Sequence, residues 1–221
     1  MTIAPLPASR SLGSMIAGLV FGLGLAVSVV VAFVALGSGA GIIALPFEMW
    51  LLDQALPVVF RLHMLASAIA LLLLPVVIGL RGCPELHRKT GWLLGAFVVI
   101  GGLTSLPVAI ASHSGAVARL GFLVQGLVWL GLFAAAIVAI RRNERAAHAV
   151  LMLAMTAVTT GAVWFRLITG SAIWLDLPFE AAYAAAAWLG WLLPLAAVVI
   201  WRRDLLAWAF RPRLSSARVS Q

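Results

Sequence analysis

Histidines and arginines are the residues of this chain best suited to chemistry. The four histidines divide by position: His63 and His113 fall toward one side of the apolar runs that contain or flank them, and His87 and His148 fall toward the other. Two histidines per side on different helices is the arrangement that a di-haem b-type cytochrome needs, because each haem iron takes one axial imidazole from each of two helices. Alternatively the histidines lie at a membrane interface, where an amphipathic ring needs no ligand.

Three arginines share the level of His63. At 1.5 Å per residue, the 18 residues from His63 to the basic loop that follows span about 27 Å, and the same separation from His148 to Arg166 gives that arginine a similar height. Arg119 begins a run on this side, and Arg61 precedes His63 by two residues. Ionisable groups in membrane runs are costly and mark candidate sites. These arginines could neutralise haem propionates or bind another anion, and the outer histidine pair with a carboxylate could hold a transition metal.

Sequence patterns of other chemistries are missing. The chain has no glycine-rich phosphate loop, no Gly-x-Ser-x-Gly, no His-Glu-x-x-His and no Cys-x-x-Cys. Its one cysteine, Cys83, excludes an internal disulfide. The histidines and the three arginines are therefore the candidate cofactor-binding set, with the histidines as candidate ligands of haem iron.

The elements that position these residues must be membrane helices. Of the 221 residues, 64% are hydrophobic and 10% are charged, against about 45–50% and about 25% in a soluble domain. In hydrocarbon every backbone polar group needs an internal partner, and the apolar runs lack the two-residue alternation of barrel strands. We therefore predict an all-α, polytopic transmembrane bundle of six helices, with the second to fifth forming a core. The runs cover residues 13–36, 57–80, 91–112, 117–140, 146–168 and 181–201.

The positions of the cations predict the orientation. With the N-terminus inside, 12 of the 15 basic residues lie on the cytoplasmic side, which leaves Arg61, Arg119 and Arg166 outside. We expect an N-in/C-in protein of the bacterial inner membrane, with a cytoplasmic segment (1–12), a membrane domain (13–210) and a basic cytoplasmic tail (211–221). Because the basic residues flank apolar runs, the net charge of +8 indicates lipid headgroups as partners and no nucleic acid.

Smaller motifs predict details of the bundle. Leu45-Pro46-Phe47-Glu48 is expected to open a short helix in the interface. The pairs Gly18/Gly22 and Gly91/Gly95 have the spacing that lets helices approach closely in a membrane.

Part of the chain also resembles a known family. The segments Arg61-Leu62-His63-Met64-Leu65-Ala66, Leu86-His87-Arg88-Lys89-Thr90-Gly91 and Ala147-His148, with Trp164-Phe165-Arg166-Leu167 closing the fifth run, resemble the bacterial multi-pass family catalogued as domain of unknown function 2306. The family pattern maps onto His63, His87, His148 and Arg166, and Thr90 departs from it. The chain is more distantly similar to four-helix di-haem cytochromes of the b561 type. The first resemblance implies a helical membrane protein, and the second implies haem b.

Two functions follow as hypotheses. The first is a redox component that holds haem b between His63 and His113 and between His87 and His148, and exchanges electrons with quinone or a redox partner protein. The second is a cofactor-free protein, either a small transporter that binds an anion at Arg61, Arg119 and Arg166 or an assembly partner.

Overall fold

Every regular element that the computed structural model describes is helical. The model describes residues 12–210, with side chains for Leu19 and from Gly22 onward. Residues 211–221 of the predicted tail, and the first eleven residues of the predicted N-terminal segment, lie outside this range. The elements are α1 (Leu12–Gly39), α2 (Phe47–Ala55), α3 (Pro57–Gly79), a short 3-10 helix η1 (Leu80–Gly82), α4 (Pro84–Ala111), α5 (Ala116–Arg141), α6 (Arg145–Thr159), α7 (Gly161–Trp174), α8 (Phe179–Ile200) and α9 (Arg202–Ala209).

Six segments of the described chain are long and apolar enough to cross a membrane, as predicted. They are Gly22–Gly39, Pro57–Gly82, Pro84–Ala111, Ala116–Arg141, Arg145–Trp174 and Phe179–Ile200. Large apolar side chains cover the outside of the bundle, where Ile42 and Trp174 are 83% and 85% exposed. An apolar exterior of this kind fits lipid as the surrounding solvent. The N-in/C-in orientation stays a prediction.

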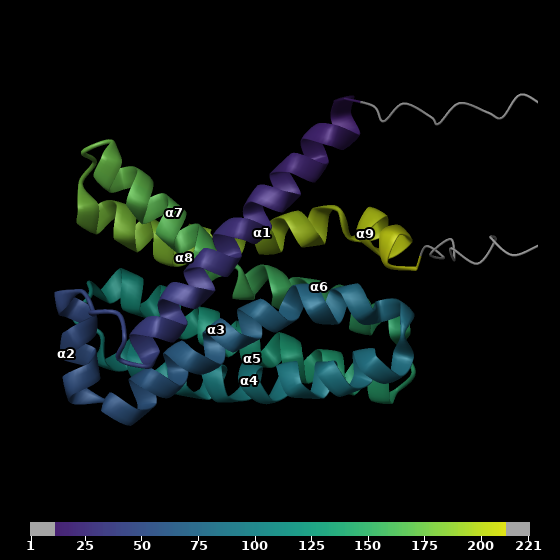
Figure 1. The fold of residues 1–221 in the computed structure, drawn as a ribbon, viewed down its shortest axis with the longest axis horizontal. Coiled ribbons are helices and arrows are strands. Elements are labelled where there is room, and N and C mark those ends of the chain that lie inside the picture. Colours follow the sequence, from purple (N-terminus) through teal and green to yellow (C-terminus); the bar gives the residue numbers. More distant parts are fainter. Residues whose placement is uncertain (1–11, 211–221) are drawn as a thin grey trace, which may run out of the picture.

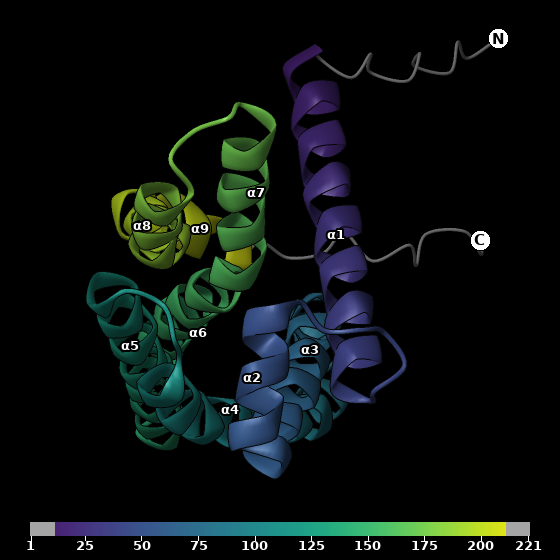
Figure 2. The same cartoon turned by 90° about the vertical axis from the view of Figure 1, so that its left-hand side faces the viewer.

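The helices α3, α4, α5 and α6 run side by side and form the body of the molecule (Figure 1). Each packs on the next, while α1 crosses α3 obliquely and α2 lies across one end (Figure 2). The predicted core of the second to fifth spans is thus present. The sixth span, α8, was expected to pack around this core, and it does pack on α5 and α6; it also packs on α7 and buries Trp191.

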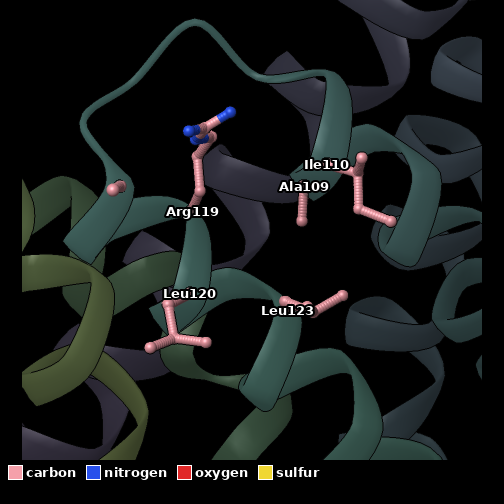
Figure 3. A pocket seen from close by; sticks show the side chains of 6 residues that line it. Ala109, Ile110, Arg119, Leu120 and Leu123 are labelled. Atoms are coloured by element: carbon pink, nitrogen blue, oxygen red, sulfur yellow. The ribbon is translucent and has the colours of Figure 1, made fainter.

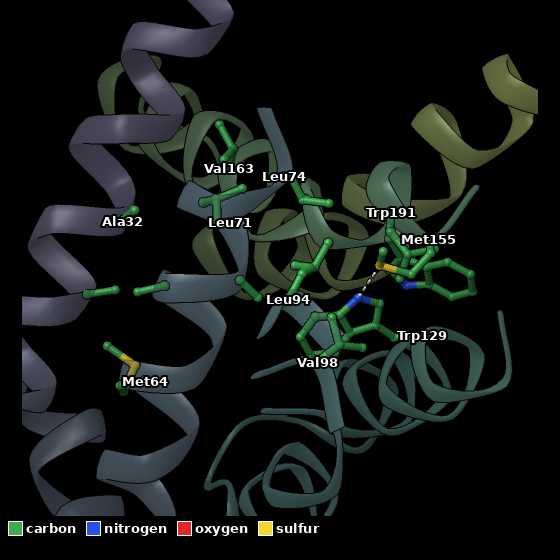
Figure 4. Close-up of a cluster of buried hydrophobic side chains, with 14 of the residues drawn as sticks. Ala32, Met64, Leu71, Leu74, Leu94, Val98, Trp129, Met155, Val163 and Trp191 are labelled. Atoms are coloured by element: carbon green, nitrogen blue, oxygen red, sulfur yellow. Dashed lines mark hydrogen bonds between the residues drawn. The ribbon is translucent and has the colours of Figure 1, made fainter. Parts of the chain in front are cut away.

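The core is built from apolar side chains of all these helices (Figure 4). Leu94 and Val98 of α4 and Met155 and Val158 of α6 are at most 1% exposed. Trp129 of α5 lies beside them. Burying aliphatic and aromatic side chains of different helices together gives the close packing on which helix association in lipid depends.

The two ends of the bundle differ in charge. The loops between α3 and α4 and between α5 and α6 lie at one end with six basic residues, Arg81, Arg88, Lys89, Arg141, Arg142 and Arg145. We call this the basic end. The opposite end, where α3, α5 and α8 begin, holds Glu48, Asp53, Asp176 and Glu180, and we call it the acidic end. The acidic end is the side predicted to face outward.

The fifth span is broken at Thr160, which the sequence did not predict. Run 146–168 was expected to be one helix, but α6 ends at Thr159 and α7 begins at Gly161. The Thr160 hydroxyl donates to the carbonyl of Ala157 (2.7 Å). Beside the break α8 approaches so closely that a Cβ on Gly190 would lie 3.2 Å from the Gly161 carbonyl oxygen. As a result α7 diverges from α6 and pairs with α8 (Figure 2).

Of the predicted glycines, Gly95 lies close to a neighbouring helix, because a Cβ there would meet the Phe133 ring of α5 at 2.6 Å, whereas a Cβ on Gly22 or Gly91 would meet open space. The surroundings of Gly18 lie outside what the structure describes. The backbone-to-backbone contacts lie instead at Gly190 and at Gly121, where a Cβ would be 2.9 Å from a carbonyl oxygen of α8. The predicted short helix, by contrast, is confirmed as α2.

Candidate functional site

His63 is held by the helix beside it. Its Nδ1 lies 3.0 Å from the carbonyl oxygen of Gly101 on α4, and the Ser67 hydroxyl is 3.4 Å from the same nitrogen. A carbonyl oxygen only accepts, so Nδ1 carries the proton and Nε2 is the free nitrogen. Among the residues whose side chains the structure describes, Nε2 has no hydrogen-bond partner, and His63 is half-buried. His63 therefore offers an oriented, unused ring nitrogen.

Arg166 faces His63 from α7. One of its guanidinium nitrogens donates to the Ala162 carbonyl of its own helix (2.8 Å). The ion pairs in the described part of the chain join Arg61 to Asp53 and Lys89 to Glu85, so Arg166 has no carboxylate partner there. His63 and Tyr183 lie within electrostatic range of its charge. A guanidinium has five N–H donors, and most of those on Arg166 are available.

Tyr183 of α8 completes this group within a cluster of aromatic rings. Its ring centroid lies 4.9 Å from that of Phe165, 5.9 Å from that of Phe122 and 5.7 Å from that of Phe179. Glu48 of α2 also acts electrostatically on Tyr183. We call His63, Arg166 and Tyr183 the polar triad.

The triad draws on three helices whose side chains lie toward the acidic end. In the described chain α7 packs on α8 and more lightly on α1 and α6, but not on α3. A space between α3 and α7 therefore separates His63 from Arg166, although the two remain within electrostatic range. The break at Thr160 produces this separation, because it turns α7 away from the body of the bundle (Figure 2).

Arg61 is occupied by a partner of its own. Its Nε and a terminal nitrogen each lie 2.8 Å from an oxygen of the Asp53 carboxylate, a two-bond pairing that ties α2 to the start of α3. The Asp53 side chain is only 5% exposed. The hydrogen bond from Arg61 holds the pKa of the Asp53 carboxyl below its ordinary value. Arg61 thus lies at the same end of the bundle as the triad, but its charge is neutralised by Asp53.

Arg119 lies apart from both. It stands at the rim of a pocket of about 240 Å³ between the end of α4 and the start of α5 (Figure 3). The predicted layer of three arginines therefore divides into one paired cation, one at a separate pocket and one in the triad.

The two histidines at the basic end fasten helices to one another. His87 is the fourth residue of α4, and its Nδ1 lies 3.0 Å from the Val77 carbonyl oxygen on α3. His148 is the fourth residue of α6, and its Nδ1 lies 2.9 Å from the Ala136 carbonyl oxygen on α5. His113 is exposed in the loop between α4 and α5. Among the described residues no group of three or more histidine, cysteine, aspartate or glutamate side chains is placed to hold a metal ion.

The hairpins α3–α4 and α5–α6 each contain a second hydrogen bond between their two helices. In the first, His63 bonds the Gly101 carbonyl; in the second, the Gln125 side-chain nitrogen donates to the Val158 carbonyl (3.2 Å). His63 and Gln125 are 62 residues apart, and His87 and His148 are 61 apart. Each hairpin thus has one cross-helix bond at its basic end and one nearer its acidic end.

Sequence reasoning found His63 and Arg166 but missed Tyr183. Tyr183 is the only tyrosine of the chain, and a lone phenol among nine tryptophans and ten phenylalanines was a signal that could have been used. Asp53 was noted as an outer acid, but its pairing with Arg61 was not anticipated.

Comparison with known proteins gives one match. The family model described as "Predicted membrane protein (DUF2306)" matches residues 60–201, which include the whole polar triad. No curated protein and no solved structure matches the chain.

Proposed function

This chain belongs to the DUF2306 family of predicted membrane proteins, and from that premise we propose that it binds a small organic anion at the polar triad. The observation that carries the proposal is the Arg166 guanidinium, a positive charge within a membrane span that has no carboxylate partner among the described residues. A charge in such surroundings is costly unless it is paired. A bound anion supplies the missing partner.

The chemistry of the triad favours a carboxylate. The planar guanidinium fork of Arg166 can donate two parallel hydrogen bonds to one carboxylate group. The Tyr183 hydroxyl can donate to the same group, and His63 Nε2 becomes a further donor when a proton is taken up together with the anion. The rings of Phe122 and Phe165, which pack on Tyr183, provide an apolar surface for the body of the ligand.

The proposed role is that of a small anion transporter in the bacterial inner membrane, with both chain ends in the cytoplasm. The excess of cations at the basic end supports this orientation, because cytoplasmic loops are rich in arginine and lysine. A reporter enzyme fused after Gln221 is expected to be active on the cytoplasmic side. Activity on the other side would reverse the assignment of the two ends.

Benzoate is a suitable probe because it joins a carboxylate to an aromatic ring. We expect the purified protein in lipid nanodiscs to bind benzoate saturably in calorimetry, and not to bind the neutral amide benzamide. Arg166→Gln removes a charged hydrogen-bond donor worth about 1.5–3 kcal/mol, so the affinity should fall by about tenfold to a hundredfold. Uptake of labelled benzoate into proteoliposomes then tests transport.

Arg119→Gln is the matched control. It removes the same charge at the same end of the bundle, away from the triad, and should leave benzoate affinity unchanged. Equal losses in the Arg166 and Arg119 variants would reduce the effect to general attraction by the surface charge. Absence of saturable benzoate binding would refute the carboxylate site.

A second candidate function, electron transfer by haem b, has its own supporting observation. His63, His87 and His148 each direct Nδ1 at a backbone carbonyl and keep Nε2 free, as iron-binding histidines commonly do. Quinone or a redox protein would be the partner. A reduced Soret band in the purified protein that is lost in His63→Ala would support this function, and a colourless protein purified from haem-sufficient cells would refute it.

A further inference from the structure

The pocket at Arg119 has the form of a site for one lipid chain. It is lined by Ala109 and Ile110 of α4 and by Ala116, Arg119, Leu120 and Leu123 of α5. All of these except Arg119 are apolar, and Arg119 stands above them toward the interhelical loop (Figure 3). At about 240 Å³ the pocket is smaller than the roughly 300–1,000 Å³ that encloses a drug-sized ligand. It can seat a chain segment.

The position of the pocket gives it access to lipid. Ala109 forms a buried floor at 4% exposure, whereas Ile110 and Leu120 are 64% and 52% exposed on the outer surface of the bundle. The pocket lies in the last turn of α4 and the first turns of α5, at the level of the acidic end. A chain that enters it comes sideways from the bilayer, with its headgroup at the same level as Arg119.

The charge of Arg119 selects the headgroup. Its guanidinium has no hydrogen-bond or ion-pair partner among residues 12–210, and the side chain is exposed. The acids at this end do not pair with it: Asp53 is bound to Arg61, and neither ion pair of the described side chains involves Glu48, Asp176 or Glu180. A guanidinium next to an apolar groove at the headgroup level is complementary to a phosphodiester with a net negative charge.

We propose that an anionic phospholipid of the leaflet at the acidic end binds this pocket, with its phosphate on Arg119 and one acyl chain between α4 and α5. This site is separate from the polar triad, and it does not depend on what the triad binds. The bound lipid fills the space between α4 and α5. These two helices are in close contact nearby, where Gly126 faces the Ser105 and Leu106 side chains. The lipid therefore acts as a structural ligand of the α4–α5 hairpin.

Native mass spectrometry of the delipidated protein tests the proposal with two probes. Dioleoyl phosphatidylglycerol and dioleoyl phosphatidylcholine have the same chains and differ in net charge. We expect one phosphatidylglycerol molecule to bind at least tenfold more tightly than phosphatidylcholine. Arg119→Gln should abolish this preference, and Ala116→Leu, which fills the pocket and keeps the charge, should weaken both lipids about tenfold.

Two control variants lie at the start of α6. Arg145→Gln and Ala146→Leu make the same changes at exposed helix-start positions at the basic end, and neither should alter the binding of the first phosphatidylglycerol molecule. Equal effects of Arg145→Gln and Arg119→Gln would overturn the proposal, because binding would then follow general surface charge. Retained preference in Arg119→Gln, or binding of free glycerol phosphate as tight as that of the lipid, would overturn it as well.

Discussion

Trp129→Phe tests the buried hydrogen bond between α5 and α6 that lies beside the break in the fifth span. The indole Nε1–H of Trp129 lies 2.8 Å from the Thr159 hydroxyl oxygen and 3.3 Å from the Met155 sulfur. Trp129 is 7% exposed, so this contact between α5 and α6 is buried (Figure 4). Thr159 is the last residue of α6, directly before the point where the chain turns into α7 and carries Arg166 toward His63.

The expected magnitude follows from two losses. Hydrogen bonds between membrane helices average about 0.6 kcal/mol and reach about 1.7 kcal/mol. Replacing a buried indole by the smaller phenyl ring leaves a cavity that costs on the order of 1 kcal/mol. Trp129→Phe should therefore destabilise the protein by about 2 kcal/mol. Thr159→Val keeps the volume and removes the acceptor together with the bond from Thr159 to the Met155 carbonyl, at a cost of about 1 kcal/mol.

A double-mutant cycle isolates the shared bond. The four proteins are unfolded reversibly with dodecyl sulfate in mixed micelles, and the free energy of unfolding is read from far-ultraviolet circular dichroism. If the bond is real, the double variant should be more stable than the sum of the single losses predicts, by about 0.6–1.7 kcal/mol. Strict additivity, within about 0.3 kcal/mol, would refute the claim that this bond stabilises the packing of α5 on α6.

Three further predictions concern the rest of the bundle. Gly121→Ala should destabilise by about 1–3 kcal/mol in the same unfolding assay, because the new Cβ would lie 2.9 Å from backbone of α8; Gly131, which has open space around it, should tolerate alanine. Asp53→Asn should flatten the acid limb of a plot of melting temperature against pH. The lowered pKa of the Asp53 carboxyl means that its pairing with Arg61 stabilises the fold above the unfolded pKa of about 3.9 and is lost as the pH falls through the lower folded value. A slope identical to wild type would contradict this pairing. His148→Leu should cost about 1–2 kcal/mol, since the α5 carbonyl loses its partner, and an unchanged melting temperature would show that this bond does not fasten the hairpin.

The six spans could be predicted because length and apolarity alone decide whether a helix crosses a bilayer. The break at Thr160 could not, because run 146–168 is continuously apolar. The break lies where α8 passes within van der Waals contact at Gly190, and α8 is a partner that no local pattern reveals. The same reason explains why Gly121, rather than Gly91, makes the close contact.

The sequence predicted the depth of the candidate site residues in the membrane, but it did not predict which residues lie next to them. A rise of 1.5 Å per residue gives the height of His63 and Arg166 from sequence counting, and the Arg166 charge lies within electrostatic range of His63. Rotation about each helix axis and the choice of neighbour come from packing, which sends Arg61 to Asp53 and Arg119 to a different groove. Tyr183 joins the triad for the same reason, since only the pairing of α7 with α8 brings it there.

A comparison of the α3–α4 and α5–α6 hairpins distinguishes the histidines that stabilise the fold from the one that can take part in ligand binding. His87 and His148 make the same bond at corresponding positions, so that bond belongs to the architecture of both hairpins. Nearer the acidic end the first hairpin has His63 and the second has Gln125, and each donates to a carbonyl of the next helix. An amide can replace the imidazole for that bond, but it does not place a basic ring nitrogen beside Arg166. His63→Gln should therefore change the free energy of unfolding by no more than about 0.5 kcal/mol, while it weakens benzoate binding. If the His63→Gln variant unfolds, His63 has a structural role like that of His87 and His148. If the variant binds benzoate with unchanged affinity, His63 does not belong to the binding site.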